Sequence, residues 1–178
     1  MNILEIKTKT LKCLKILEKN EKVIIQNDIN ERTIAHKFAE YLQIEFSAFN
    51  VDVEYNRNFE NGRYEPKQAS LIINVFEESY QKAKDTNQDI SEFMKQVTTY
   101  PDIIIHQRGN NDKNLLIIEI KKDNNKSDWR IDEKKLEAFT RRKEEEGYNY
   151  ILGMHLTIYI GTEWRKPTYE WYIKGIKE

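Results

Sequence analysis

The chain has 178 residues, of which 33% are charged, and its formal net charge is −1 at pH 7. This length favours one domain with its own hydrophobic core, and the near-zero net charge excludes a global field that would attract nucleic acid. No apolar run approaches the roughly 20 residues that span a membrane, no secretory signal is visible, and Cys13 is the single cysteine. We therefore expect one cytoplasmic domain over residues 1–178, with no membrane partner and no internal disulfide.

Two helices are predicted in the first part of the chain, over about residues 3–19 and 31–43, because apolar residues recur there at helical spacing. The first helix carries Cys13 on its apolar stripe, which indicates a small buried residue of the core. The stripe of the second helix consists of Ile34, Ala35, Phe38 and Leu42. Glu31 precedes this stripe by three and four residues and is therefore expected on the same helix face.

The remaining predicted elements are mainly strands. A strand over about residues 49–56 is followed by the segment 57–100, which we interpret as an insertion. After it we expect strands over about 102–107 and 114–121, a helix over about 131–146, and strands over about 148–160 and 168–174. From the second helix onward, the order αβββαβ predicts an α/β fold with a mixed sheet flanked by helices. If the strands beside the 131–146 helix are parallel, their crossover is expected to be right-handed.

Three charged residues lie at one end of the predicted hairpin. Asp102 follows Pro101 at the start of the first strand, and Glu119 and Lys121 alternate with isoleucines on the second. The strand period of two places Glu119 and Lys121 on one face. Charges at the end of a buried hairpin are costly without a partner or a metal, and two carboxylates can hold a divalent cation through oxygen. The alternatives are a Pro-Asp turn at Asp102 and a buried salt bridge between Glu119 and Lys121.

These residues resemble the motif of the PD-(D/E)xK nuclease superfamily, with Pro101-Asp102 as its first half and Glu119-Ile120-Lys121 as its second. Residues 30–39 look like the first core helix of that superfamily, and residues 51–57 look like its first core strand. The chain is similar to small, single-domain bacterial members without an assigned pathway. The resemblance implies a restriction-endonuclease-like core over about residues 21–160, with the N-terminal helix (1–20) before it and a C-terminal strand (about 161–178) after it.

The resemblance also implies a Mg²⁺-dependent nuclease, with Mn²⁺ as a substitute ion. Asp102, Glu119 and the carbonyl of Ile120 would bind the metal. Lys121 would orient the attacking water and neutralise charge on the phosphate, or it would act as a base if its pKa were depressed. Glu31 would support the site from the helix; the alternative is that it only interacts favourably with the helix dipole.

A basic segment follows the motif. From residue 121 to residue 143, nine Lys or Arg residues stand against five Asp or Glu residues, which predicts contacts with phosphate groups. The candidate contacts are Lys122, Lys126, Arg130, Arg141 and Arg142. The alternative is a solvated helix face with ion pairs. Within this helix, we interpret Asp132 and Lys135 as an i,i+3 ion pair. The alternative is that both residues flank the motif residues from the helix.

Other polar residues give weaker signals. Asp52 and Glu54 alternate with apolar residues, which is typical of a half-solvated strand. The histidines and Cys13 lack the spacing of zinc ligands, and the sequence has no glycine-rich phosphate loop. The histidines are His36, His106 and His155.

The expected function is hydrolysis of phosphodiester bonds in nucleic acid, with DNA as the expected substrate and RNA left open. The alternative is a catalytically inactive module that binds nucleic acid or protein and retains the nuclease fold. No helix-turn-helix or zinc finger is recognisable in the sequence. Targeting would therefore depend on a homodimer or on a partner protein.

Overall fold

A six-stranded mixed β-sheet forms the centre of the computed structural model, which describes residues 1–55, 57–60, 63–66, 81, 84–86, 101–124, 129–145 and 147–178. Its strands, in spatial order, are β1 (Asn50–Val53), β4 (Ile103–His106), β5 (Leu116–Lys122), β6 (Leu152–Ile158), β7 (Thr168–Ile173) and β8 (Ile176–Lys177). Neighbouring strands are antiparallel except β5 and β6, which are parallel. The prediction of an α/β fold with a mixed sheet is therefore confirmed.

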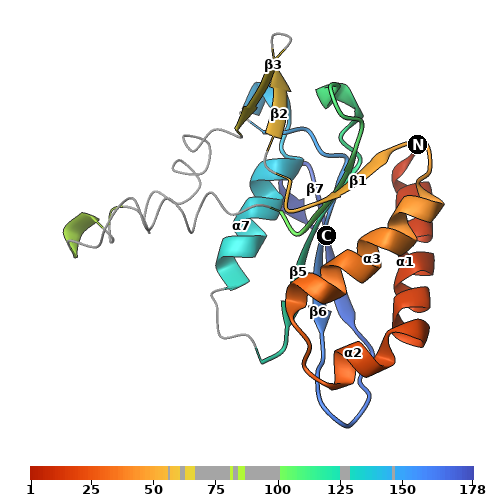
Figure 1. The fold of residues 1–178 in the computed structure, drawn as a ribbon. Helices are drawn as coiled ribbons and strands as arrows, with labels where there is room; N and C mark the ends of the chain where they lie inside the picture. Colours follow the sequence, from red (N-terminus) through yellow and green to blue (C-terminus); the bar gives the residue numbers. More distant parts are fainter. Residues whose placement is uncertain are drawn as a thin grey trace.

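Helices cover both faces of this sheet (Figure 1). The helices are α1 (Ile3–Asn20), α2 (Lys22–Gln26), α3 (Glu31–Glu45) and α7 (Trp129–Thr140). Two short 3₁₀ turns, Asn111–Lys113 and Lys143–Glu145, lie in the connections. None of the helices in the described ranges is long and apolar enough to cross a membrane.

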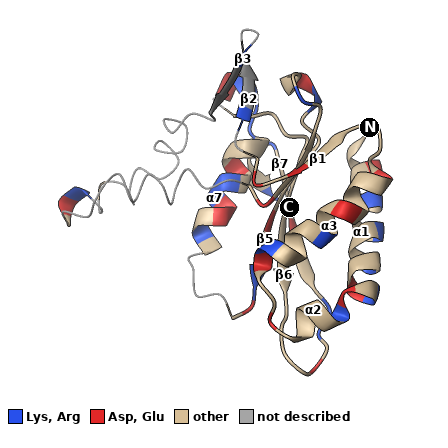
Figure 2. Cartoon of the chain, viewed as in Figure 1, with Lys and Arg blue, Asp and Glu red and all other residues tan. Residues whose placement is uncertain are grey.

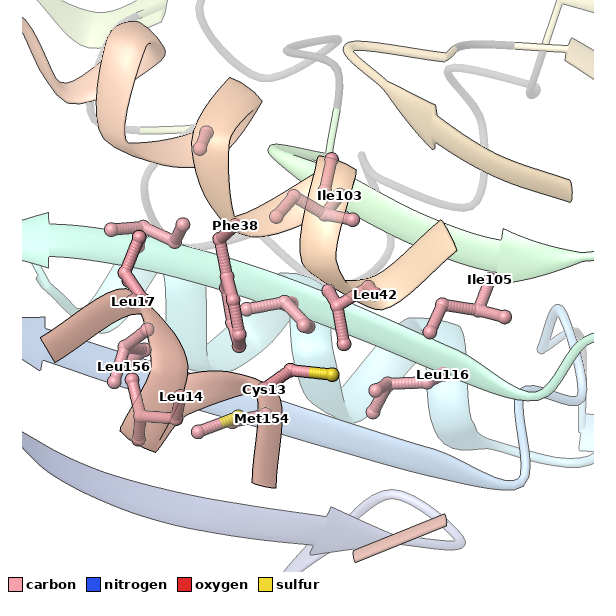
Figure 3. Close-up of a cluster of buried hydrophobic side chains, with 14 of the residues drawn as sticks. Cys13, Leu14, Leu17, Phe38, Leu42, Ile103, Ile105, Leu116, Met154 and Leu156 are labelled. Atoms are coloured by element: carbon pink, nitrogen blue, oxygen red, sulfur yellow. The ribbon is translucent and has the colours of Figure 1, made fainter. Parts of the chain in front are cut away.

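Two layers of apolar side chains hold the helices against the sheet. On the face covered by α1 and α3, the predicted stripe of α3 is buried as expected, and Phe38 and Leu42 contribute to the core around Ile103 and Ile105 (Figure 3). Cys13 belongs to this core, and burial raises the pKa of its thiol to about 11. The thiol is therefore a core residue, as its position on the stripe predicted.

The opposite face is covered by α7. Its Leu136 packs with Phe139, Ile104 and Ile117 in a second, smaller apolar cluster. Because α7 lies in the chain between the parallel strands β5 and β6, it forms the crossover that the sequence predicted. Alternate residues of β4 and β5 thus belong to opposite layers, as the strand period requires.

Some boundaries differ from the prediction. Helix α7 ends at Thr140, six residues earlier than expected, because the chain turns back there and Asn149 and Gly147 donate to the carbonyls of Arg141 and Arg142. Gly147 permits this close approach, since a Cβ at this position would lie 2.1 Å from the Arg141 oxygen. The elements absent from the prediction are α2, β8 and the hairpin of β2 (Arg57–Glu60) and β3 (Arg63–Pro66). The rest of the predicted insertion 57–100 lies outside the described residues, apart from residues 81 and 84–86.

Candidate active site

The candidate site lies beside the first residue of β4, at the edge where β5 extends beyond its antiparallel neighbour. Pairing between these strands stops at Ile103 and Ile118, whereas β5 extends to Lys122. On its other side, β5 stays paired with β6 as far as Lys122. On the β4 side, the backbone groups of β5 beyond Ile118 are therefore not paired by β4, and they need hydrogen-bond partners from elsewhere.

Two carboxylates supply these partners. Oδ2 of Asp102 accepts a hydrogen bond from the backbone nitrogen of Ile120 at 2.6 Å, and Oε2 of Glu31 accepts one from that of Lys122 at 3.1 Å. The two nitrogens are about 6.6 Å apart, because a strand rises about 3.3 Å per residue. The two carboxylates are therefore neighbours along this side of β5, and Glu31 adds to burial in raising the pKa of Asp102. Glu31, from α3, thus lies beside the motif residues.

The backbone of Ile120 also presents its oxygen to this side. In an extended strand, the N–H and the C=O of one residue point to the same side of the strand. Because the Ile120 nitrogen points toward Asp102, its carbonyl points to the same side of β5. The three metal ligands that the resemblance implies therefore come from the residue before β4 (Asp102) and from two successive residues of β5 (Glu119 and the carbonyl of Ile120).

Side chains from α7 pair with Glu119 and Lys121. The two β5 residues lie on the α7 face, as the strand period predicted, but Glu119 does not pair with Lys121. Instead, Lys135 Nζ lies 2.7 Å from Glu119 Oε2, and Lys121 Nζ lies 3.1 Å from Asp132 Oδ2. A distance of 3.2 Å between Lys135 Nζ and Asp132 Oδ1 joins the two pairs. The alternative of a Glu119–Lys121 salt bridge is wrong.

The role of α7 was underestimated from the sequence. The predicted i,i+3 pair of Asp132 and Lys135 is present, and the same two residues also reach β5. Their position on the stripe with Leu136 and Phe139 was the signal for this arrangement, because this stripe faces the sheet.

His155 was also missed. It is buried, lies directly opposite Glu119 on β6 and has its ring centroid 5.8 Å from that of Trp129.

Burial shifts the protonation equilibria of the cluster. Burial raises the pKa of Asp102 to about 6, although the hydrogen bond from Ile120 opposes the shift. Burial also raises the pKa of Glu119 well above its ordinary value. Burial alone would lower the pKa of Lys121, but the carboxylates of Asp132 and Glu31 outweigh it and raise this pKa. The lysine is thus held in its charged form, which argues against its role as a general base.

The charge balance of the cluster favours a divalent cation. When ionised, the four carboxylates of Glu31, Asp102, Glu119 and Asp132 outnumber the ammonium groups of Lys121 and Lys135, and a bound cation would favour the ionised forms of Asp102 and Glu119. In addition, Oε1 of Glu119 is buried and has no hydrogen-bond partner among the described residues. A buried carboxylate oxygen of this kind is costly unless a ligand satisfies it. A cation at this oxygen would relieve both the excess charge and the missing interaction.

The donor set for such an ion is small. Within the described part of the chain, no group of three or more His, Cys, Asp and Glu side chains could hold a metal ion. The set implied by the resemblance is of another kind, since it combines two carboxylates with the Ile120 carbonyl. Mg²⁺ accepts such a set because it binds proteins through one or two carboxylates and retains several waters. The residues present therefore fit this ion.

The basic residues are distributed along α7 and its flanks. Lys122 lies at the site, and its Nζ forms an ion pair with Asp28 at 2.7 Å. Arg130 is exposed in the first turn of α7, whereas Arg141 and Arg142 follow its last turn. Figure 2 shows acidic and basic positions interspersed along this helix. Lys126 lies outside the described residues.

These positions separate two groups of candidate phosphate contacts. Arg141 is nine residues from Asp132, which corresponds to about 13 Å along a helix axis. It is partly buried and approaches Gly175, where an added Cβ would lie 2.7 Å from its Cγ. Lys122 and Arg130 are therefore better placed than Arg141 to meet a phosphate chain at the site.

The residues of β1 belong to a separate cluster. Asp52 lies 2.8 Å from His106 Nε2 and 2.9 Å from Arg108 Nε. Burial would raise the pKa of Asp52, but these two partners outweigh burial and hold it at about 2. Glu54 pairs with Arg32 at 2.7 Å. All four residues of β1 are half-buried, without the alternation that the sequence predicted, and Glu54 lies just after the end of the strand.

Comparisons of the chain with protein-family models, with curated proteins and with solved structures gave no match. The interpretation of the site therefore depends on the geometry of its own residues. The resemblance to the PD-(D/E)xK superfamily likewise depends on the residues that carry the motif.

Proposed function

We propose that the chain is a Mg²⁺-dependent nuclease that hydrolyses phosphodiester bonds, with DNA as its substrate. The observation that carries this proposal is that Asp102 and Glu31 accept hydrogen bonds from the backbone of Ile120 and Lys122, on the part of β5 that also carries Glu119. The succession α3, β1, β4, β5, α7 and β6, with its antiparallel pairs and one parallel crossover, supports a restriction-endonuclease-like core.

Each residue has a distinct part in this proposal. Asp102, Glu119 and the Ile120 carbonyl would hold Mg²⁺ or Mn²⁺. When bound, such an ion polarises a phosphate oxygen and makes a water molecule more acidic. Lys121, kept charged by Asp132, would neutralise the charge that develops on the phosphate. Glu31 would fix the end of β5 and add a third carboxylate beside the phosphate.

A second function, that of a binding module without catalysis, is favoured by one observation. Glu119 is fully buried and already paired with Lys135, as in a structural ion pair. Incubation of the pure protein with plasmid, single-stranded DNA and RNA distinguishes the two functions. We expect cleavage with Mg²⁺ or Mn²⁺ and none with EDTA. Binding without cleavage under every condition would favour the non-catalytic module.

Replacement of Asp102 by Asn tests the metal site through stability. Mg²⁺ should raise the melting temperature of the wild type, since a ligand at 100 times its Kd stabilises the folded state by about 2.7 kcal/mol. Asp102→Asn removes one anionic ligand and should reduce this shift. The measurement is thermal unfolding followed by circular dichroism, with and without millimolar Mg²⁺. An unchanged melting temperature of the wild type would contradict an ion site.

The same variant has an expected pH dependence without metal. The folded-state pKa of Asp102, about 6, is above its ordinary value of 3.8, so the folded chain binds this proton more tightly than the unfolded chain. The contribution of Asp102 to stability is therefore present below about pH 4 and is lost as the pH rises through 6. In EDTA, we expect Asp102→Asn to gain up to about 3 kcal/mol relative to the wild type between pH 4 and pH 7. Urea unfolding at both pH values measures this gain, and a constant difference between the two proteins would contradict it.

Replacement of basic residues tests the nucleic-acid interface. If Lys122 and Arg130 contact phosphates, their double replacement by Ala should weaken the binding of all sequences alike. The slope of log K against log salt concentration should become flatter by roughly 1.4 to 1.8, depending on whether the bound nucleic acid is single- or double-stranded. Fluorescence anisotropy in EDTA measures both quantities. The double variant of Arg141 and Arg142 is the matched comparison, and unchanged slopes in both would indicate a solvated helix face.

A further inference from the structure

Lys135 is a buried ammonium group between two carboxylates. Its residue is 5% exposed, and its Nζ lies 2.7 Å from Glu119 Oε2 and 3.2 Å from Asp132 Oδ1. Removing an ammonium group from water is costly, and the cost is offset only by close partners of opposite charge. Glu119, 1% exposed, has the same requirement. In the protein without metal, the two residues therefore stabilise one another.

The two oxygens of Glu119 have different surroundings. Oε2 accepts the hydrogen bond from Lys135, whereas Oε1 is buried without a hydrogen-bond partner among the described residues. A cation bound at Oε1 would be separated from the ammonium group by one carboxylate group, together with the cation–oxygen bond and the 2.7 Å hydrogen bond of Lys135. Like charges on the two sides of one buried carboxylate repel each other more than they would in bulk water. Metal and Lys135 therefore compete for the charge of Glu119.

We propose that Lys135 is an internal counter-ion of the metal site, which keeps Glu119 in place before a divalent cation binds and lowers the affinity of the site for that cation. The inference rests on the proposed function, because the cation is the one assigned to Asp102, Glu119 and the Ile120 carbonyl. Asp132 gives the ammonium group a second acceptor when the metal binds. The site is therefore folded before metal binds, and its affinity for the metal is lower than it would be without Lys135.

Binding of Mn²⁺ to variants of Lys135 tests this proposal without any cleavage assay. Lys135→Met removes the charge and keeps most of the length of the side chain, and Lys135→Gln removes the charge but retains a hydrogen-bond donor on a shorter side chain. Lys134→Met is the matched control, since Lys134 is the neighbouring residue on α7 and pairs with Glu137 at the surface. Isothermal titration calorimetry at pH 8 measures the Kd for Mn²⁺, and circular dichroism in EDTA measures the melting temperature.

Both Lys135 variants should bind Mn²⁺ more tightly than the wild type, by roughly 5- to 150-fold, the usual range for coupled sites. In EDTA, the melting temperature of Lys135→Met should fall by roughly 10 °C, because Glu119 loses its partner. Lys134→Met should leave both values unchanged. A Lys135→Met chain that folds only in the presence of Mn²⁺ would also support the proposal.

Equal or weaker Mn²⁺ binding by both Lys135 variants, each folded by circular dichroism, would overturn the proposal, because both remove the charge of the ammonium group. If the wild type binds Mn²⁺ in that experiment, the metal site of the proposed nuclease stands and only the role of Lys135 is wrong. If neither the wild type nor any variant binds Mn²⁺, the metal site and the role of Lys135 both fail.

Discussion

Replacement of Glu119 by Gln should abolish Mg²⁺-dependent cleavage. The amide keeps the shape of the side chain and can still accept a hydrogen bond from Lys135, but it removes the anionic oxygen that would bind the metal. Lys121→Ala should reduce the rate by roughly 10²- to 10³-fold, the usual loss when one group that stabilises transition-state charge is removed. The measurement is the rate of plasmid cleavage with Mg²⁺, together with the Kd for Mn²⁺.

The two variants are expected to differ in metal binding. Glu119→Gln should weaken Mn²⁺ binding, whereas Lys121→Ala should leave it largely in place, since the Lys121 ammonium pairs with Asp132. Glu40→Gln and Lys134→Ala are matched controls on exposed helix faces, and both should cut at the wild-type rate. Wild-type cleavage by folded Glu119→Gln and Lys121→Ala would show that the proposed active site is wrong, and absence of cleavage by the wild type would show that the nuclease proposal is wrong.

Glu31→Ala should reduce cleavage by one to a few powers of ten, of the order seen when groups that support metal ligands are lost. The structure gives the reason. Glu31 accepts a hydrogen bond from the backbone nitrogen of Lys122. Two residues earlier on β5, Asp102 accepts one from the backbone nitrogen of Ile120. Without this carboxylate, the end of β5 loses a partner, and the site loses a negative charge close to the metal ligands.

A second substitution separates these two effects. Glu31→Gln keeps an oxygen that can accept the hydrogen bond from Lys122 but removes the charge. Its melting temperature should therefore be closer to that of the wild type than the melting temperature of Glu31→Ala, whereas its cleavage should remain slow. Glu40→Ala is the matched control, because Glu40 is on the same helix and its partners Lys37 and His36 are at the surface. Full activity of Glu31→Ala would remove Glu31 from the site and leave the proposed roles of Asp102, Glu119 and Lys121 untouched.

The position of the motif on its elements followed from the sequence. A period of two is a local property of a strand, so the alternation around Glu119 and Lys121 was sufficient to place both on one face. The spacing of Phe38 and Leu42 likewise defined the buried face of α3 and placed Glu31 at its start. The mixed sheet followed from the order of the elements, because a crossover helix is the usual connection between parallel strands and a short connection is compatible with an antiparallel pair such as β4 and β5.

The partners of the charged residues depended on the tertiary structure. Lys121 lies two residues from Glu119, yet the ammonium group that reaches Glu119 comes from Lys135, because α7 packs across this face of β5. The hydrogen bond between Glu31 and Lys122 joins residues 91 positions apart. It requires β4 to end before β5, and that difference in length is a property of the assembled sheet.

The end of α7 shows the same division. Helical spacing extended the prediction to residue 146, but the helix ends at Thr140 because the returning chain supplies the hydrogen bonds at its end. Periodicity thus determined which face of each element is buried and which charged residues are brought to that face. Tertiary packing alone decided which of these charges meet, because charges are neutralised by whichever opposite charge is nearest in space.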